Sequence, residues 1–259
     1  MDLLSTRNLP AVIAAQTTVI YKAVLRESRH IEQPNFEKIG TDDLDRLLRL
    51  YDEHFFGGWL TETVRARTPL PLVFRLSGRM TRAGGKTTKY VQRRPDGGVR
   101  SYFEIAIAGR MLFMTFGDVQ RPVVVCGLTC EDRLQALQRI MEHEIIHLAE
   151  LLVWDRSRCS GARFKALAKN IFGHSGTKHA LVTAREHASV QHGARVGSMV
   201  GFEFEGRRLV GRINRIHRRA TVLVADSKGQ RYSDGKQYAK FYVPLEALEP
   251  LAARDTDRS

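Results

Sequence analysis

Helical spacing of apolar residues predicts four helices in the first two thirds of the chain. The clearest pattern runs over 129–153, where apolar residues recur every three or four positions and mark one wide face of a helix. These residues are Leu134, Leu137, Met141, Ile145, Leu148 and Leu152. Weaker patterns predict helices over 10–26, 41–54 and 161–172. Thr41 and Thr129 are the expected N-caps of two helices, because acidic residues follow each threonine and favour the positive end of a helix.

Short β-like segments lie between these helices and again after about residue 190. The first set, 72–76, 89–92 and 102–108, is separated by basic and glycine-rich turns, which is typical of a small antiparallel sheet. In the second set apolar residues alternate with polar or small ones, and 227–229 is expected to be a turn. The strands of the second set are expected over 200–204, 209–216, 220–225 and 240–243.

Together these patterns predict an α+β chain with two folded parts. We expect an N-terminal extension over 1–40, a mixed domain over 41–185, a small all-β barrel over 195–250 and a polar tail over 251–259. A length of 259 residues is enough for two such domains, each with a core of its own.

Cysteine usage and apolar runs indicate the cellular setting. Three cysteines are too few, and odd in number, for a disulfide framework, so we expect a reducing compartment. No apolar run approaches the ~20 residues that a membrane helix needs, and the first residues lack the basic leader of a signal peptide. The sequence therefore predicts a cytoplasmic protein with no membrane partner, and its charge is compatible with association with the nucleoid.

Positive charge is concentrated in two stretches of the chain, whose formal net charge is +13. Residues 75–100 hold eight basic residues and one acidic residue, and 195–240 hold eleven basic and four acidic ones. Such concentration suits binding to DNA phosphates without sequence specificity, and a solubilising surface is the alternative. The candidate DNA contacts are Arg79, Arg82, Lys86, Lys89, Arg93 and Arg94.

Four aromatic residues lie among the basic residues of the second stretch, namely Tyr232, Tyr238, Phe241 and Tyr242. Such side chains could stack on bases. Aromatic residues in a strand-rich segment also commonly fill a core, so both interpretations stay open.

The segment His143-Glu144-Ile145-Ile146-His147 has the H-E-x-x-H spacing of a metal site. On a helix, residues four apart lie on one face about 5–6 Å from each other, so both imidazoles can bind one zinc ion. Glu144 is rotated away from that line and can take a proton from a metal-bound water, whose pKa falls to about 7. The alternative is a pair of core histidines that are hydrogen-bonded to the backbone or to carboxylates.

A catalytic zinc ion usually takes three protein ligands and keeps one open position. The candidates for the third ligand are Cys159, His174, His179 and Glu150. If the helix that begins near Gly161 starts beside the metal, His174 lies about 20 Å further along it. This geometry favours Cys159, with His174 as the alternative.

Several segments, in order, resemble the SprT-like (Spartan-like) zinc metalloprotease family over about 42–181. They are 50–60 (LYDEHFFGGWL), 76–85 (LSGRMTRAGG), 103–107 (FEIAI), 143–147 (HEIIH) and 160–164 (SGARF). The family pattern after the metal helix is H-G-x-x-F, whose histidine is the third ligand, and Ser160 occupies that position here.

The resemblance implies a zincin-type fold with a three-stranded antiparallel sheet, a zinc ion, and proteolysis of proteins that are bound or crosslinked to DNA. Several relatives carry a zinc ribbon behind the catalytic domain, whereas this chain has a basic segment similar to an SH3-like or KOW-like barrel. Ser160 favours an alternative, a non-catalytic zinc-stabilised module that binds DNA or protein. A peptidase that acts on free peptides is a third interpretation.

Overall fold

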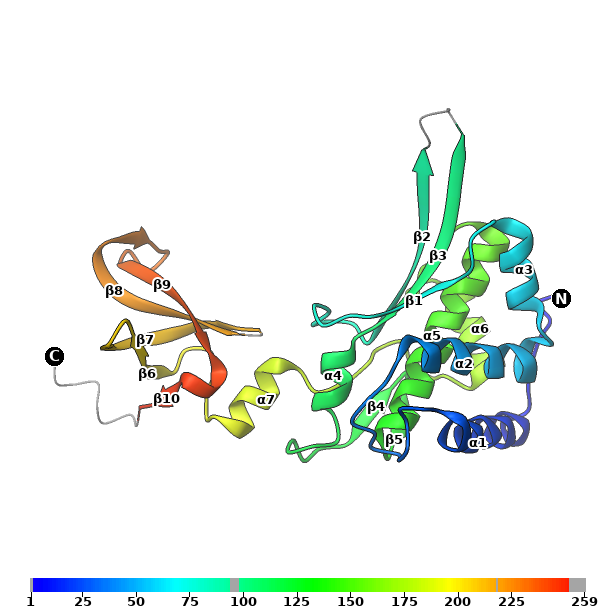
Figure 1. Ribbon diagram of the computed structural model, residues 1–259, viewed down its shortest axis with the longest axis horizontal. Coiled ribbons are helices and arrows are strands. Elements are labelled where there is room, and N and C mark those ends of the chain that lie inside the picture. The colour runs from blue at the N-terminus through cyan, green and yellow to red at the C-terminus, as the bar shows by residue number, and fades with distance from the viewer. Residues whose placement is uncertain (1, 94–97, 218, 252–259) are drawn as a thin grey trace. The chain divides into compact units, whose positions relative to one another are not determined.

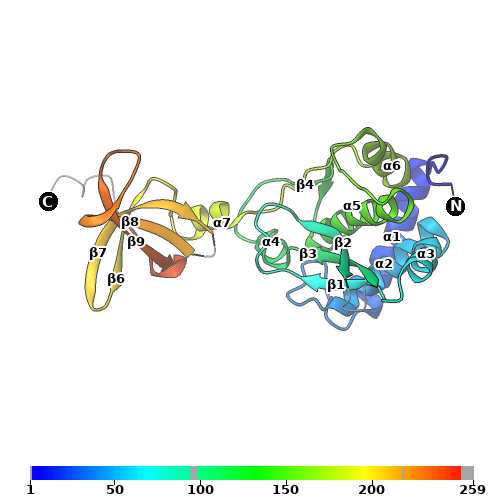
Figure 2. The ribbon, with the colours of Figure 1, turned by 90° about the horizontal axis from the view of Figure 1, so that it is seen from above.

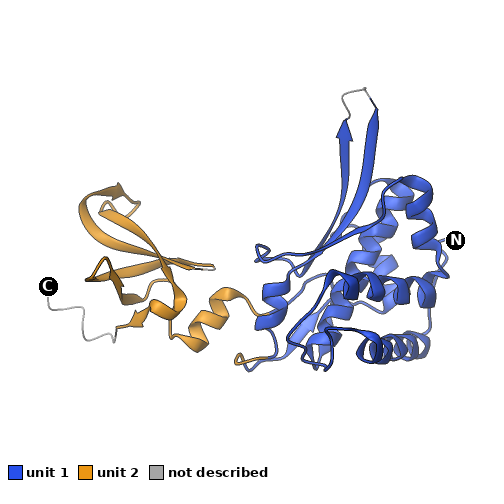
Figure 3. Cartoon of the chain, viewed as in Figure 1, with its two compact units in different colours: residues 1–116, 120–181 blue, residues 117–119, 182–259 orange. Residues whose placement is uncertain are grey.

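The structure, a computed structural model, describes residues 2–93, 98–217 and 219–251 and divides into two compact units (Figure 3). The first unit comprises Met1–Phe116 and Gln120–Leu181, and the second comprises Gly117–Val119 and Val182–Ser259. Helices and strands both contribute, as expected for an α+β chain. Nearly all of the predicted tail, 252–259, lies outside the described residues. Within the described part of the chain, no helix combines the length and apolar character needed to cross a membrane.

Helix α5 (Arg133–Trp154) runs through the middle of the first unit (Figures 1 and 2). It packs against the sheet and against the other helices of the unit. Those helices are α1 (Pro10–Glu27), α2 (Thr41–Tyr51), α3 (Trp59–Arg67), α4 (Gly109–Met114) and α6 (Ala162–Phe172), and a π-helical turn, η1 (Asp52–Phe56), lies between α2 and α3. The apolar residues of α5 identified by their spacing are all buried. Because Ala136, Ile140 and Ile146 are buried as well, α5 is enclosed on nearly every side.

The start of α5 differs from the prediction. Asp132, not Thr129, is the N-cap, and its carboxylate accepts a hydrogen bond from the Gln135 backbone N–H at 2.8 Å. Thr129 instead lies in β5 (Leu128–Cys130), which pairs with β4 (Val123–Val125). A short strand pair thus precedes the helix, and propensity alone does not reveal such a pairing.

The sheet of the first unit has the order β1–β3–β2, with β1 at Val73–Leu76, β2 at Gly85–Arg93 and β3 at Val99–Ile107. Strands β2 and β3 form an antiparallel hairpin that projects from the unit (Figure 1), but β1 runs parallel to β3. The expectation of an antiparallel sheet is therefore wrong for β1. The reason is that Leu76 and Gly85 both pair with Ile107, so β1 ends and β2 begins at the same end of β3.

The segment 2–40 contributes buried residues to the core of the first unit, so the unit extends over most of the segment expected to be an extension. Ile13, Ile20 and Val24 of α1 are buried with Ile31 and Phe36 in the same cluster as the apolar face of α5. Only a few apolar residues of α1 face inward, and the buried face also includes a threonine and an alanine. The helix therefore lacks the strong apolar stripe that would have marked it as part of the core.

The second unit is a five-stranded antiparallel sheet of order β10–β6–β7–β8–β9 with one helix. Its elements are α7 (Ala184–Gln191), β6 (Met199–Phe204), β7 (Arg207–Ile216), β8 (Arg219–Arg231), β9 (Gln237–Pro244), the 3-10 turn η2 (Leu245–Ala247) and β10 (Glu249–Pro250). The unit is not all-β as expected, because Ala188 of α7 lies in its core. The expected turn at 227–229 lies inside β8, where Tyr238 pairs with both Ala225 and Gln230 and the residues between them bulge outward.

A fully buried carboxylate, Glu142, ties three parts of the first unit together. Its Oε1 atom accepts hydrogen bonds from the Tyr51 hydroxyl on α2 and from Arg139, both at 2.7 Å. Its Oε2 atom lies 2.7 Å from His174 Nε2, in the segment after α6. A side chain with no exposed surface depends on these partners, because an unpaired charge there would be costly.

We predict that Glu142→Ala destabilises the protein by about 3–5 kcal/mol, because Arg139 then keeps a largely buried charge without its partner. Tyr51→Phe removes one hydrogen bond and should cost about 1 kcal/mol. Urea unfolding measures both values, with Glu53→Ala at an exposed position as the control, expected to stay within about 0.5 kcal/mol. Equal effects of Glu142→Ala and Glu53→Ala would contradict this role for Glu142.

Candidate metal centre

The two histidines of the H-E-x-x-H segment lie one turn apart in the middle of α5. Their ring centroids are 4.9 Å apart, and the ring of Phe164 on α6 packs against both, at 4.8 Å from His143 and 4.4 Å from His147. Burial lowers the pKa of His143 to about 2 and that of His147 to about 4. Both imidazoles are therefore neutral near pH 7, which is the state that binds metal ions.

Cys159 joins the two histidines, as the sequence predicts. One ligand atom from each of His143, His147 and Cys159 lies within 4.8 Å of the other two, so these residues could hold a metal ion. The chain turns back because α5 ends at Trp154, the next residue, Asp155, has a left-handed φ of 56°, and α6 begins only at Ala162. Two nitrogen donors and one sulfur donor are a set that suits zinc.

The hydrogen bonds of His147 leave one of its ring nitrogens free for a metal. His147 Nδ1 lies 2.6 Å from the Ser157 hydroxyl, which donates to Glu150 Oε2 at 2.6 Å. Since that hydroxyl has only one proton, it accepts from Nδ1–H, and the Nε2 lone pair remains available. Glu150 also accepts from Arg163 Nε at 2.7 Å. Glu150, a candidate ligand in the sequence, is therefore linked to His147 Nδ1 through Ser157 and does not share a ligand group with the two histidines.

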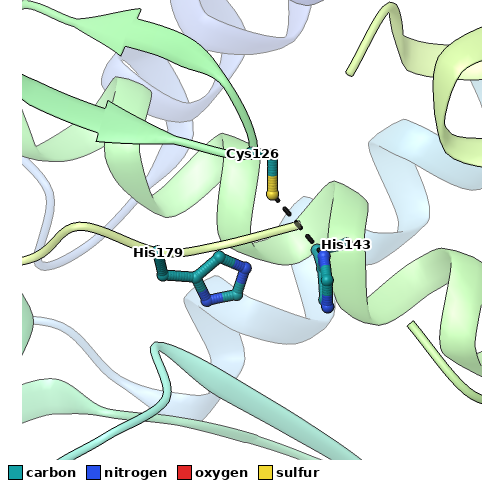
Figure 4. Close-up of side chains that lie close together, drawn as sticks. All are labelled: Cys126, His143 and His179. Carbon is teal, nitrogen blue, oxygen red and sulfur yellow. Dashed lines mark hydrogen bonds between the residues drawn. The ribbon is translucent and has the colours of Figure 1, made fainter. Parts of the chain in front are cut away.

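His143 has an equivalent partner in Cys126. The Cys126 sulfur lies 3.5 Å from His143 Nδ1, and the other ring nitrogen points away from the sulfur (Figure 4). Burial raises the pKa of the Cys126 thiol far above its usual range, so the thiol stays protonated and is directed at the Arg139 carbonyl at 3.7 Å. The spacing of residues along the chain gives no signal of this contact between Cys126 and His143.

His179 lies beside His143 with 4.6 Å between the ring centroids, and Cys126, His143 and His179 form a second group whose ligand atoms lie within 4.8 Å of one another (Figure 4). His179 Nδ1 accepts a hydrogen bond from the Gly84 backbone N–H at 3.2 Å. A neutral ring that accepts at Nδ1 carries its proton on Nε2. The Cys126 thiol is protonated, and neither ring nitrogen of His179 has a free lone pair. This second group is therefore the less suitable set of metal ligands.

His174 belongs to neither group. It is buried, and its Nε2 atom contacts Glu142 instead. The geometry does not support the alternative that named His174 as the third ligand, because α6 carries the chain away from Cys159 before His174 is reached.

Glu144 is buried against the start of β2 and is only 1% exposed. Its Oε2 atom accepts a hydrogen bond from the Thr87 hydroxyl at 2.7 Å. A Cβ atom on Gly85 would lie 2.6 Å from Oε1, so a glycine is required there. Burial raises the pKa of Glu144 to about 8, although the hydrogen bonds with Thr87 lower it. A carboxyl group in this range can both accept and return a proton near neutral pH.

The candidate DNA contacts do not form one surface. Arg79 and Arg82 are exposed in the loop between β1 and β2, while Lys86, Lys89 and Arg93 lie on β2. Alternate residues of a strand face opposite sides, so Lys86 points away from the side shared by Lys89 and Arg93. Lys89 is half-buried in an ion pair with Asp155. The sixth candidate, Arg94, lies outside the described residues.

Comparisons with protein-family models, with curated proteins and with solved structures found no match for this chain. The case for a function therefore depends on the geometry of the metal centre and on the family resemblance of its sequence segments.

We predict that Cys159→Ala lowers the zinc bound per chain, while Cys126→Ala leaves it unchanged. The physical reason is that, among the residues that the structure describes, Cys159 is the one that shares a group with both histidines of the H-E-x-x-H segment. Elemental analysis of the purified variants, with circular dichroism to check folding, measures the effect. Zinc loss in Cys126→Ala alone would assign the metal to the second group instead.

Proposed function

We propose that this protein is a zinc-dependent peptidase of the SprT-like kind, with a zincin-like first unit and an SH3-like second unit. The observation that supports the proposal is the convergence of His143, His147 and Cys159, together with the buried carboxyl group of Glu144, the residue that follows His143 on α5. Metal ligands and an adjacent proton acceptor are the two parts that metal-assisted hydrolysis requires.

Each residue has a defined role in this proposal. His143, His147 and Cys159 would hold the zinc ion, which when bound supplies a water of pKa about 7 and polarises the carbonyl under attack. Glu144 accepts the proton of the attacking water and passes it to the leaving amine. Ser157 and Cys126 keep the two imidazoles in the tautomer that leaves Nε2 free.

The position of β2 supports a polypeptide substrate. It is an edge strand, since β3 is its one neighbour in the sheet, and it begins at Gly85 beside Glu144. The outer edge of such a strand can pair with an extended peptide through backbone hydrogen bonds. A peptide bound in this way would lie next to the proposed base.

The basic side chains near β2 support an action on DNA-associated proteins in the cytoplasm or at the nucleoid. Arg79, Arg82, Lys86 and Arg93 are exposed on the β2–β3 hairpin and on the loop before it. Arginine and lysine side chains contact phosphates without reading sequence. These side chains could thus contact DNA phosphates from more than one face of the hairpin while a bound protein is cleaved.

A second candidate function is a zinc-stabilised DNA- or protein-binding module without catalysis. Ser160 favours it, because serine stands where the resemblance places a histidine ligand. The close packing of Glu144 between Thr87 and Gly85 favours it too, since this carboxyl group would have to reach a water. Both candidates keep zinc, and they differ only in turnover.

We predict that Glu144→Gln keeps the zinc content of the protein and lowers proteolysis by about 10²–10⁴-fold, the usual contribution of a general base. The assay follows cleavage of a DNA-bound protein, with and without single-stranded DNA. Glu53→Gln, at an exposed position, is the matched control and should keep full activity.

Three outcomes separate the interpretations. Equal turnover of Glu144→Gln and the parent chain would contradict the mechanism. Zinc binding without turnover in the parent chain would favour the non-catalytic module. Turnover that is independent of DNA would favour a peptidase that acts on free peptides.

A further inference from the structure

The second unit has a basic groove on one face of β7, β8 and β9. The groove has a volume of about 490 Å³, and its lining includes Arg215, Arg219, Thr221, Lys240 and Tyr242. This volume lies within the range of about 300–1,000 Å³ that is typical of small-ligand pockets. None of these residues belongs to the candidate metal centre, so the groove needs a separate explanation.

The strand register brings these side chains together. Thr221 of β8 pairs with Arg215 on β7 and with Tyr242 on β9, so the three side chains form a row across the sheet. Arg219 lies two residues before Thr221, and Lys240 lies two residues before Tyr242. Because side chains two apart on a strand share a face, all five project from the same side of the sheet.

The cations of the groove have no acidic partner within 2–93, 98–217 and 219–251. Two other arginines of β7 form ion pairs with carboxylates at the surface, but no ion pair among the described residues involves Arg215, Arg219 or Lys240. Three uncompensated positive charges around one hollow favour an anionic ligand.

Tyr242 adds a flat apolar surface to this positive region. Its side chain is 64% exposed, whereas the next residue, Val243, is buried in the core of the unit. An exposed aromatic ring between cations is the arrangement that binds single-stranded nucleic acid, since the ring stacks on a base and the cations contact the flanking phosphates.

We propose that this groove binds single-stranded nucleic acid, with Tyr242 stacked on a base and Arg215, Arg219 and Lys240 on the adjacent phosphates. A duplex is the poorer ligand, because its bases are already stacked on each other and do not offer a free face. The site is independent of hydrolysis in the first unit, so either proposal can fail while the other holds.

The test is a fluorescence anisotropy titration of the full-length chain with labelled oligothymidylate and oligouridylate of about 12 nucleotides. A duplex of the same length is included. Tyr242→Leu should weaken single-strand binding about fivefold or more, and Tyr242→Phe should restore it, because a phenyl ring still stacks. The two labelled strands show whether DNA or RNA is preferred.

A matched pair of charge variants distinguishes binding in the groove from non-specific electrostatic attraction between the nucleic acid and the basic surface. Arg219→Gln should lower the slope of log Kd against log salt concentration by about 0.7, the value for one phosphate contact on a single strand. Arg207→Gln removes the same charge from an exposed position at the start of β7, outside the groove, and should leave the slope unchanged.

Several results would overturn the proposal. They are unchanged binding in Tyr242→Leu, equal slopes in the two arginine variants, tighter binding of the duplex, and equal competition by an acidic peptide. Thermal unfolding of each variant shows whether it is folded, and since Tyr242, Arg219 and Arg207 are exposed, all should keep the parent midpoint.

Discussion

The arrangement of the first unit depends on polar groups that are buried in the middle of an apolar helix. His143 and Glu144 are 4% and 1% exposed, and such groups are costly to bury unless each has a partner. The partners come from elements far apart in the chain. Cys126, in the segment after β4, contacts His143, and Thr87 on β2 contacts Glu144. Ser157, in the segment after α5, contacts His147. The candidate metal centre is therefore a point where several separate segments are held together.

Other residues of the same helix form buried hydrogen bonds that hold the unit together. At its start, the guanidinium group of Arg133 donates to backbone carbonyls of the 35–36 segment and of α4. One residue before His143, Glu142 binds Tyr51 and His174. Because Glu142 immediately precedes His143 on α5, a change that loosens the contacts of Glu142 would also displace the His143 imidazole. Stability and the geometry of the candidate metal centre are therefore expected to change together.

The features that sequence predicted well are those set by local spacing. The apolar steps along α5 follow from helix geometry. The short link between α5 and α6 brings Cys159 close to the two histidines, and whether these three residues bind a metal stays a prediction. The direction of β1 and the bulge in β8 depend on pairing with strands further along the chain, which the spacing of apolar residues does not encode. The N-cap at Asp132 was missed because Thr129 pairs with β4 in a short hairpin that the spacing does not reveal either. The role of Cys126 was missed for the same reason, since it meets His143 only after folding.

Zinc K-edge X-ray absorption spectroscopy of the purified full-length protein tests the central claim most directly, because it reports the atoms bound to the metal. The account predicts one zinc ion per chain with two nitrogen donors at about 2.0–2.1 Å and one sulfur donor at about 2.3 Å. A spectrum without a sulfur donor, or a protein that binds no zinc, would contradict it.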